Sequence, residues 1–420
     1  MASCKANDAV YHVDPPPAAK KLRELFYCAH VLHSHIAHFY ALAAPDFVVG
    51  PQSDPAERNI LGLIAKVGLE TGGEVIKHRA YAQDIQAVIG GKASHPVCGL
   101  PGGMSKPISE EERTDFEQKA KSMVEFGKLS LKIFADVVLA NKEYLDLILS
   151  DAYTMKSYYM GMVDANNKVA FYDGDIKVID PDGKEFAKFP PSNYLDYIAE
   201  HTEPWSYLKF PFLKKVGWKG LVEGNDSGIY RVASLARLNA ADGMATPLAQ
   251  AEYEKMYHTL GGKPVHATLA THWARLIEVQ YLAERLLELS QDKEITDPNV
   301  RNIPTATPTE GIGIVEAPRG TLIHHYQTDD RGIVKKVNLI VATGNNNGAM
   351  CISVKKAAQG VIKAGKEITE GLLNMVEMAW RAYDPCMACA THSLPGQVPL
   401  EVVIYDAEGT EVKRLGQNIL

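Results

Sequence analysis

The sequence predicts an α+β fold in which helices dominate. Several long stretches place apolar residues at the three- and four-residue spacing of one helix face, and two other stretches alternate as strands do. Neither a repeat nor a low-complexity linker occurs, which favours one compact body. Apolar residues make up 46% and charged residues 23% of the 420, as expected for a globular chain that can bury a large core.

Two helices are predicted in the first third of the chain. The first follows Pro15–Pro17 and presents an apolar face of Leu22, Leu25, Phe26, Ala29, Ile36 and Tyr40. Ser109 and Glu112 have the spacing of a capping box. They open a long helix that is expected to run through Leu145.

Strands follow, and then further helices. Residues 151–220 hold alternating runs such as Val169–Tyr172, with turns expected at Asn166–Asn167 and Asp182–Gly183, and residues 312–343 form a second set of strands.

The later helices have recognisable starts and ends. Thr246 and Pro247 suit an N-cap and a first helical position, and residues 267–289 continue as helix. The last helix ends before Pro385 and carries one apolar stripe made of Ile368, Leu372, Val376 and Ala379.

Charge and cysteine content exclude several classes of protein. A net charge of −7 lacks the clustered Lys and Arg of a nucleic-acid-binding surface. No run of 18 apolar residues occurs, so no membrane-spanning helix is predicted, and the first six residues contain no apolar signal core. Six cysteines are too few for a disulfide framework in a chain of this length. We therefore expect a cytoplasmic protein whose thiolates serve a metal.

The most informative segment is Asp384–His392, with the sequence Asp-Pro-Cys-Met-Ala-Cys-Ala-Thr-His. Two residues separate Cys386 from Cys389, so one tight turn can direct both sulfurs at a single ion, and His392 adds an imidazole. Thiolates and imidazoles select nickel, zinc, copper(I) or iron over magnesium or calcium. The segment is therefore interpreted as a metal or redox site.

Other segments place polar residues in apolar surroundings. Taken singly, the histidines of the first helix are expected to be core or interface residues; they are His30, His33, His35 and His38. Arg319 lies between apolar strands, where a buried guanidinium needs an anionic partner. Glu316 would face the opposite side of its strand, so we expect an anionic ligand or an acid from elsewhere in the chain. Residues 341–348 are expected to form a polar loop at a strand end.

Together these segments resemble the large subunit of a nickel-iron hydrogenase. The resemblance is carried by the Asp-Pro-Cys-x-x-Cys-x-x-His motif, by Ala-Pro-Arg-Gly at residues 317–320 and by His-x-His-x-x-His-Phe-Tyr at residues 33–40, and it covers essentially the whole chain. It is closest to the cytoplasmic, multi-subunit branch that includes the methyl-viologen-reducing enzymes. It implies a helix-dominated α+β fold with a long central helical bundle and peripheral β segments, and it implies reversible heterolytic cleavage of H2.

The resemblance also implies ligands for the metals. Cys386 would be terminal on nickel, and Cys389 would bridge nickel to an iron that carries cyanide and carbon monoxide. His392 would bind a separate magnesium or iron. For the base that takes the proton from H2, we favour the Cys386 thiolate over the guanidine of Arg319, because arginine normally stays protonated.

Further residues are implied around the metals. Arg319 would lie at the open coordination side, with Asp46 and Asp384 holding the arginine or the surrounding network. Thr343 would hydrogen-bond a cyanide. The neighbouring positions of the site would be Pro318, Ala342 and His38.

Partner proteins are implied by the same resemblance. This chain has no further cysteine set for an iron–sulfur cluster, so an iron–sulfur small subunit is expected, docked near the histidine-rich helix and the metal loop across a large apolar interface. Heterodisulfide reductase and another electron-transfer protein are possible further partners. A maturation endopeptidase is expected to cut after His392 and remove residues 393–420, which would leave a single domain over residues 1–392.

One part of the family pattern is missing. The family carries a first cysteine pair in a Cys-Gly-x-Cys-x-x-x-His segment, and Met1–Ala6 resembles the residues that come directly after that histidine. We therefore expect the natural start to lie upstream, because without that pair the chain would be an inactive homologue. Three alternatives stay open: a structural zinc module with one more ligand, a thioredoxin-like dithiol, and a scaffold related to the respiratory complex I protein of the same fold.

Overall fold

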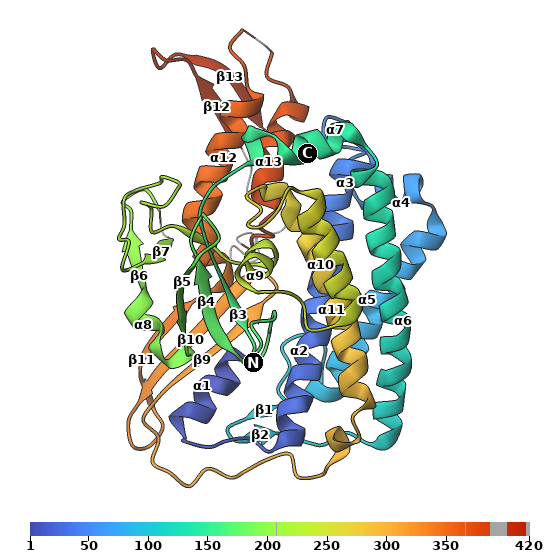
Figure 1. Ribbon diagram of the computed structural model, residues 1–420, viewed down its shortest axis with the longest axis vertical. Coiled ribbons are helices and arrows are strands. Elements are labelled where there is room, and N and C mark those ends of the chain that lie inside the picture. Colours follow the sequence, from blue (N-terminus) through green and yellow to red (C-terminus); the bar gives the residue numbers. More distant parts are fainter. Residues whose placement is uncertain (207, 366, 387–400, 417–420) are drawn as a thin grey trace. The chain divides into compact units, whose positions relative to one another are not determined.

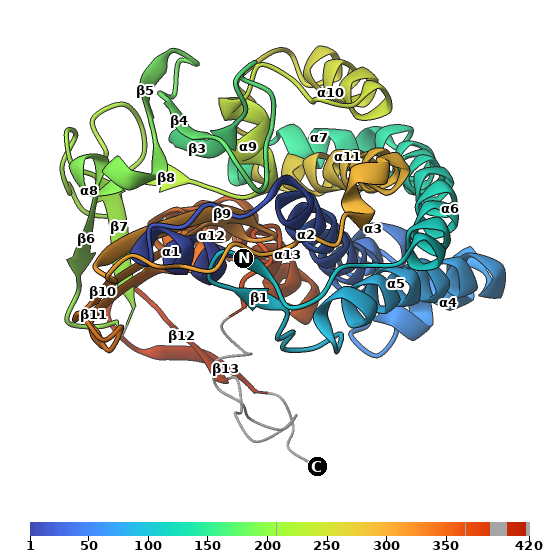
Figure 2. The same ribbon diagram turned by 90° about the horizontal axis from the view of Figure 1, so that it is seen from below.

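Helices and sheets occupy opposite sides of the first of the chain's two units. The computed structural model describes residues 1–206, 208–365, 367–386 and 401–416, and the two compact units are Met1–Asp384 and Pro385–Leu420. On one side of the first unit, four long helices pack side by side (Figure 1, Figure 2): α2 (Pro17–His38), α5 (Leu69–Gly90), α6 (Glu110–Phe134) and α11 (Thr271–Gln291). This arrangement confirms the predicted helix-dominated α+β fold with a central helical bundle.

Shorter helices surround this bundle. They are α1 (Ala2–Val10), α3 (Ala44–Val48), α4 (Ile60–Val67), α7 (Lys142–Leu149), α8 (Tyr194–Tyr197), α9 (Ser234–Ala240), α10 (Pro247–Thr259), α12 (Asn347–Val361) and α13 (Glu370–Arg381). Two π-helical turns, Phe39–Ala43 and Ala135–Leu139, come directly after α2 and α6. The 3-10 turns are Asp151–Tyr153, Pro191–Asn193, Thr268–Ala270, Lys293–Thr296 and Ala342–Asn346.

Local signals explain where several helices begin. The predicted capping box of α6 is confirmed, because Glu112 N donates to Ser109 Oγ at 3.1 Å and Ser109 N donates to Glu112 Oε2 at 2.8 Å. The prediction that this helix continues through Leu145 is wrong. Asn141 starts a separate helix, α7, since its side chain accepts a hydrogen bond from the amide of Glu143, as an N-cap does.

The strands of the first unit belong to four small sheets in the described residues. Two of them hold most strands, in the orders β5–β4–β3–β8 and β11–β10–β9. The bounds are β1 (Gly99–Leu100), β2 (Gly103–Met104), β3 (Tyr158–Val163), β4 (Asp175–Ile179), β5 (Glu185–Phe189), β6 (Ile198–Thr202), β7 (Lys209–Leu213), β8 (Tyr230–Arg231), β9 (Glu310–Ala317), β10 (Gly320–Thr328) and β11 (Val334–Ile340). Strands in both predicted regions are therefore confirmed.

One predicted strand is wrong. Val169–Tyr172 forms no strand, although the turn before it is confirmed by the left-handed φ of 58° at Asn167. The Asp164 carboxylate accepts hydrogen bonds from the amides of Asn166 and Lys168, which tightens this turn. The amide of Val169 then donates to Gly243 O, so this run is held by a neighbouring loop instead of a ladder.

Helix α1 lies directly on strand β9 because that strand presents glycines. A Cβ at Gly311 would come within 2.2 Å of Ala6 O, and a Cβ at Gly313 within 2.2 Å of Ala2 O. No other residue type would leave room for this close approach between two backbones.

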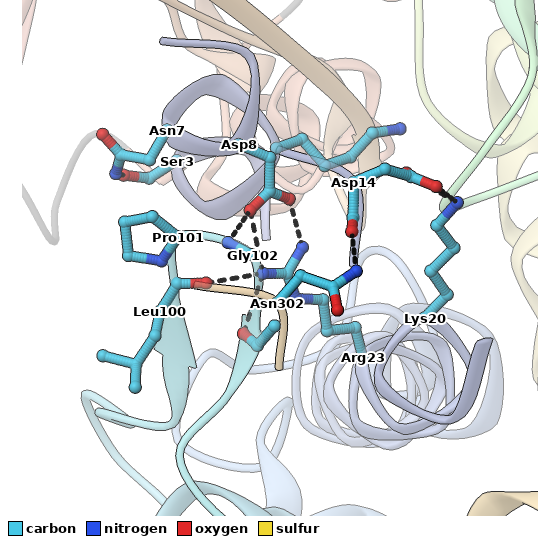
Figure 3. Close-up of polar contacts among 12 residues, drawn as sticks. Ser3, Asn7, Asp8, Asp14, Lys20, Arg23, Leu100, Pro101, Gly102 and Asn302 are labelled. Carbon is cyan, nitrogen blue, oxygen red and sulfur yellow. Dashed lines mark hydrogen bonds and ion pairs between the residues drawn. The ribbon is translucent and has the colours of Figure 1, made fainter. Parts of the chain in front are cut away.

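A buried ion pair fastens the other end of α1 (Figure 3). The Asp8 carboxylate lies between the amide of Gly102, at 2.8 Å, and the guanidinium of Arg23 on α2, at 2.5 Å. The same guanidinium donates to the carbonyls of Leu100 and Gly103, at 2.9 and 2.8 Å. One arginine therefore joins α1, α2 and the β1–β2 hairpin.

The second unit contains a β-hairpin of β12 (Glu401–Tyr405) and β13 (Glu411–Gly416). The predicted domain boundary at His392 lies outside the described residues. Among those residues, no helix combines the length and the apolar character needed to cross a membrane.

Candidate metal centre

A two-residue turn presents Arg319 at the tip of a hairpin. Strands β9 and β10 pair with Ala317 opposite Gly320, so Pro318 and Arg319 are the turn residues. Proline suits the second position of such a turn and glycine the fourth. Gly320 has a φ of +126°, a conformation that L side chains rarely adopt. The sequence Ala-Pro-Arg-Gly therefore fixes the place from which the arginine extends.

Asp384 is the partner of Arg319. Arg319 Nε donates to the backbone carbonyl of Asp384 at 2.6 Å, and its Nη2 donates to Asp384 Oδ1 at 3.2 Å. The prediction of an acid from elsewhere in the chain is thus confirmed, and Glu316 pairs with Arg237 instead. The arginine is less buried than predicted, because its side chain is 28% exposed.

The Asp384 carboxyl is buried, and its backbone is strained. The residue is 3% exposed and has a left-handed φ of 54°. Burial raises the pKa of Asp384, while Arg319 and Arg275 act in the opposite direction. Its second oxygen, Oδ2, is buried and has no hydrogen-bond partner among the described residues. A buried carboxylate oxygen without a donor is costly, so a nearby cation would stabilise it.

Three side chains bind carbonyls at the C-terminal end of α13. His38 Nε2 donates to Arg381 O at 2.8 Å, Arg275 Nη2 donates to Ala382 O at 2.8 Å, and Arg319 binds the carbonyl of Asp384. The last carbonyls of a helix lack partners within the helix and carry partial negative charge, so guanidinium and imidazole donors suit them. These contacts fix the backbone that leads into Cys386.

Arg275 and its neighbour are buried on α11. Arg275 Nη1 also donates to His272 Nδ1 at 3.2 Å, and the ring of His272 stacks on that of His38 at a centroid distance of 5.8 Å. Burial lowers the pKa of Arg275 to about 10 and that of both histidines well below the ordinary value. The histidines are therefore neutral at pH 7, and the arginines carry the positive charge of this region.

Asp46 holds the surrounding network and not Arg319. Its carboxylate accepts from Arg381 Nη1 at 2.6 Å and from Asn374 Nδ2 at 3.0 Å, both on α13. Burial raises the pKa of Asp46, and Arg381 opposes this. The carboxylate thus anchors the last turn of α13 to α3.

The polar segment after β11 is helical and not the predicted loop. It forms the 3-10 turn Ala342–Asn346 and then continues as α12. Ala342 is buried and Thr343 half-buried at the start of that turn. Asn346 Nδ2 donates to Arg319 O at 3.4 Å, which ties this segment to the arginine turn.

The structure brings only part of the metal motif into view. Cys386 is half-buried and lies two residues after Asp384, whereas Cys389 and His392 lie outside the described residues. Within the described part of the chain, no group of three or more His, Cys, Asp or Glu side chains could hold a metal ion.

Comparison with known proteins decides the family. A family model, described as nickel-dependent hydrogenase, matches residues 1–58 and 162–392. The chain belongs to the nickel-dependent hydrogenases. It is a catalytic large subunit, an oxidoreductase that acts on H2. This membership favours the hydrogenase over the zinc module, the dithiol and the complex I scaffold.

Individual relatives support this hydrogenase assignment over most of the chain. Identity is 52% to an F420-non-reducing hydrogenase iron-sulfur subunit of Archaeoglobus profundus, over 99% of this chain and 85% of that protein. Identity is 35% to the NAD-reducing hydrogenase HoxS subunit beta of Cupriavidus necator, over 94% and 80%. The crystal structure of an NAD+-reducing [NiFe]-hydrogenase in the H2-reduced state matches with a TM-score of 0.86 and 34% identity, over 93% of this chain and 84% of that one.

The donor chemistry of the hydrogenase fits nickel. Cys386 supplies a thiolate, a soft ligand of the kind that nickel and iron accept, and the sequence repeats it at Cys389. The unpartnered Oδ2 of Asp384, two residues before Cys386, is a second feature that a cationic centre would stabilise.

Sequence reasoning missed several charged residues of this region. Arg275 and Glu278 are fully buried on α11, and Arg237 is fully buried on α9. A signal was present for two of them: Arg275 and Glu278 interrupt the apolar run of residues 273–279, where charged side chains must be paired.

Proposed function

We propose that the Arg319 turn, the end of α13 and the Cys386–Cys389 pair form the site where this hydrogenase splits H2. The observation that carries the proposal is the contact between Arg319 and Asp384. Asp384 precedes Cys386 by two residues, so their Cα atoms lie at most about 7 Å apart. The guanidinium and the first metal thiolate are therefore confined to one small region.

Each residue of the site has a distinct role. The nickel–iron centre supplies the site at which H2 is polarised and split and through which electrons leave. The Cys386 thiolate takes up the proton at Sγ. Arg319 stays protonated and presents a fixed positive charge at the open side of the site. Asp384 keeps that charge in place through its carbonyl and carboxylate.

We assign the finer ligands in the same way. Cys389 bridges nickel to an iron that carries cyanide and carbon monoxide, and Thr343 donates to a cyanide. The link from Asn346 to Arg319 O supports the placement of Thr343, because both residues belong to the same 3-10 turn. His392 binds a separate magnesium or iron.

The electrons pass to an iron–sulfur small subunit. Exposed apolar side chains near the histidine-rich helix support a docking surface there: Leu42, Ile60, Leu61, Leu69 and Ile76 are 51%, 43%, 74%, 84% and 65% exposed. Leu42 lies just after α2, and the other four lie on α4 and α5, which pack against each other. Such a group of apolar side chains is typical of an interface. A further electron-transfer subunit, heterodisulfide reductase and a cytoplasmic location stay predictions.

The experiment measures metal and turnover on protein purified with its partner subunits from its natural source. Cys386→Ser should lose at least nine-tenths of its nickel, and the control Cys351→Ser, on the half-buried face of α12, should keep it. Arg319→Lys should keep its nickel but lower H2-oxidation turnover at least 30-fold, because lysine cannot reproduce the planar fork. Normal turnover in Arg319→Lys, or full nickel in Cys386→Ser, would show that the site lies elsewhere.

Maturation by an endopeptidase is proposed as well. Active protein should end at His392, because the mature site would be closed only after residues 393–420 are removed. Intact-mass measurement of an active preparation checks this directly. An active enzyme that still carries Leu420 would contradict it.

A further inference from the structure

A fully buried arginine lies beneath the turn that presents Arg319. Arg237, on α9, is 0% exposed, and so are its two acidic partners, Glu278 on α11 and Glu316 on β9. Arg237 Nε and Nη2 donate to the two oxygens of Glu278 at 2.6 and 2.8 Å, and Nη1 donates to Glu316 Oε2 at 2.8 Å. Three separate elements are thereby joined by one guanidinium.

The remaining donors of Arg237 bind the turn itself. Nη1 donates to Ala317 O at 2.9 Å, and Nη2 donates to Pro318 O at 3.3 Å. A guanidinium has five N–H donors, and the five contacts of Arg237 use them all. Two of these contacts end on the carbonyls immediately before Arg319.

The two glutamates are themselves held in place. Glu278 Oε2 accepts from Ser234 Oγ at 2.5 Å and from His35 Nε2 at 2.8 Å, and Glu316 Oε1 accepts from Thr321 Oγ1 at 2.7 Å. Burial acts to raise the pKa of Glu278, but Arg237 and His35 lower it to about 2, so this carboxylate is ionised. The carboxylate thus fixes the orientation of the guanidinium below the turn.

Stability alone does not explain such an arrangement. Buried ion pairs of this kind are often no more stabilising than apolar residues of the same volume, because both charges lose their hydration. An apolar replacement could not bind two adjacent carbonyls in a fixed direction. The five contacts therefore point to a geometric role.

We propose that Arg237, oriented by Glu278 and Glu316, is the positioning residue that sets where Arg319 stands. The inference rests on the proposed function, in which Arg319 acts at the metal centre. Arg237 holds the backbone of residues 317–318, while Asn346 holds the next carbonyl.

The test is Arg237→Lys in protein purified with its partner subunits. The matched control is Arg23→Lys, since Arg23 is also 0% exposed, pairs with a carboxylate and binds two backbone carbonyls. These contacts of Arg23 are with Asp8, Leu100 and Gly103, outside the turn. Three quantities are measured: amide hydrogen exchange in peptides spanning residues 317–321, nickel content, and the pair kcat and KM for H2.

Arg237→Lys should speed exchange in these peptides at least 10-fold and lower kcat at least 10-fold, with nickel content and KM within twofold of the unchanged protein. Arg23→Lys should leave exchange in the same peptides and kcat within twofold. Unchanged exchange in Arg237→Lys, or faster exchange with unchanged kcat, would overturn the proposal. So would an equal effect of the control.

A second variant covers the case in which Arg237→Lys does not fold. Glu316→Gln keeps the shape and one acceptor, and it should speed exchange and lower kcat at least threefold; no change in either would overturn the positioning role. Failure of the proposed function is distinguishable from failure of this inference. If Arg319→Lys keeps full turnover while Arg237→Lys speeds exchange at the turn, the role of Arg319 is wrong and the anchoring of the turn stands.

Discussion

Replacing Gly320 with alanine tests whether the two-residue turn determines where Arg319 points. The φ of +126° at Gly320 is a conformation that costs an alanine about 1–3 kcal/mol. The new Cβ would also meet Val232 Cγ2 at 2.0 Å and Val232 Cβ at 2.7 Å. Nonbonded carbon atoms prefer about 3.5–4.0 Å, so the turn or Val232 must move.

The two costs can be added because they arise from different degrees of freedom. Forcing an extra carbon into a packed site costs about 1–3 kcal/mol, which brings the total to about 2–6 kcal/mol. For a cooperative unit of this size, the entropy of unfolding corresponds to a fall in Tm of about 1 °C per kcal/mol. We therefore expect Tm to fall by about 2–6 °C.

The same displacement should reach the arginine. A turn that moves away from Val232 lengthens the contacts from Arg319 to Asp384, so turnover should fall about 10-fold, which corresponds to about 1.4 kcal/mol in the barrier. The assays are differential scanning calorimetry and H2 oxidation. The control is Gly344→Ala, where an added Cβ meets no atom within 4 Å and φ is ordinary. A Gly320→Ala protein with wild-type Tm and turnover would refute the argument.

Two further predictions concern titrating groups. Burial lowers the pKa of His35 to about 4, so the unfolded chain takes up a proton below pH 6.5 that the folded protein refuses; stability should fall by about 3 kcal/mol between pH 6.5 and 4. His35→Gln should flatten this dependence in a series of melting curves, and superimposable curves would count against it. Asp384→Asn keeps the shape and tolerates the left-handed φ, but it removes the charge facing Arg319 and Arg275; turnover should fall at least 10-fold, and an unchanged rate would argue that this charge is not needed.

Much of the fold could be predicted because its signals are local. The capping box of α6 involves two residues three positions apart, and the start of α10 depends on an adjacent Thr–Pro pair. The wrong predictions arose where a distant or weaker local contact won. Asn141 caps α7 and ends the helical run earlier than the apolar pattern suggested. Val169 gives its amide to Gly243, which no alternation of apolar residues could indicate.

The candidate site was predictable to a smaller extent. The logic of charge showed that Arg319 needs an acid, but not that Asp384 supplies it from 65 positions away. Nothing in the local sequence connects His38 with Arg381, which are 343 positions apart. The sequence states only that the last carbonyls of a helix need donors, and any element of the fold can provide them.

The end of α13 is where stability and chemistry depend on the same contacts. Its last carbonyls form the negative end of the helix dipole, and the fold brings Arg275, Arg319 and His38 to them. Because burial keeps the histidine neutral, the two arginines supply the positive charge there. An arginine that caps a helix has a fixed position, and a fixed positive charge is what a site that develops and releases protons requires. The residue that closes the helix is thus also the one placed to act beside Cys386.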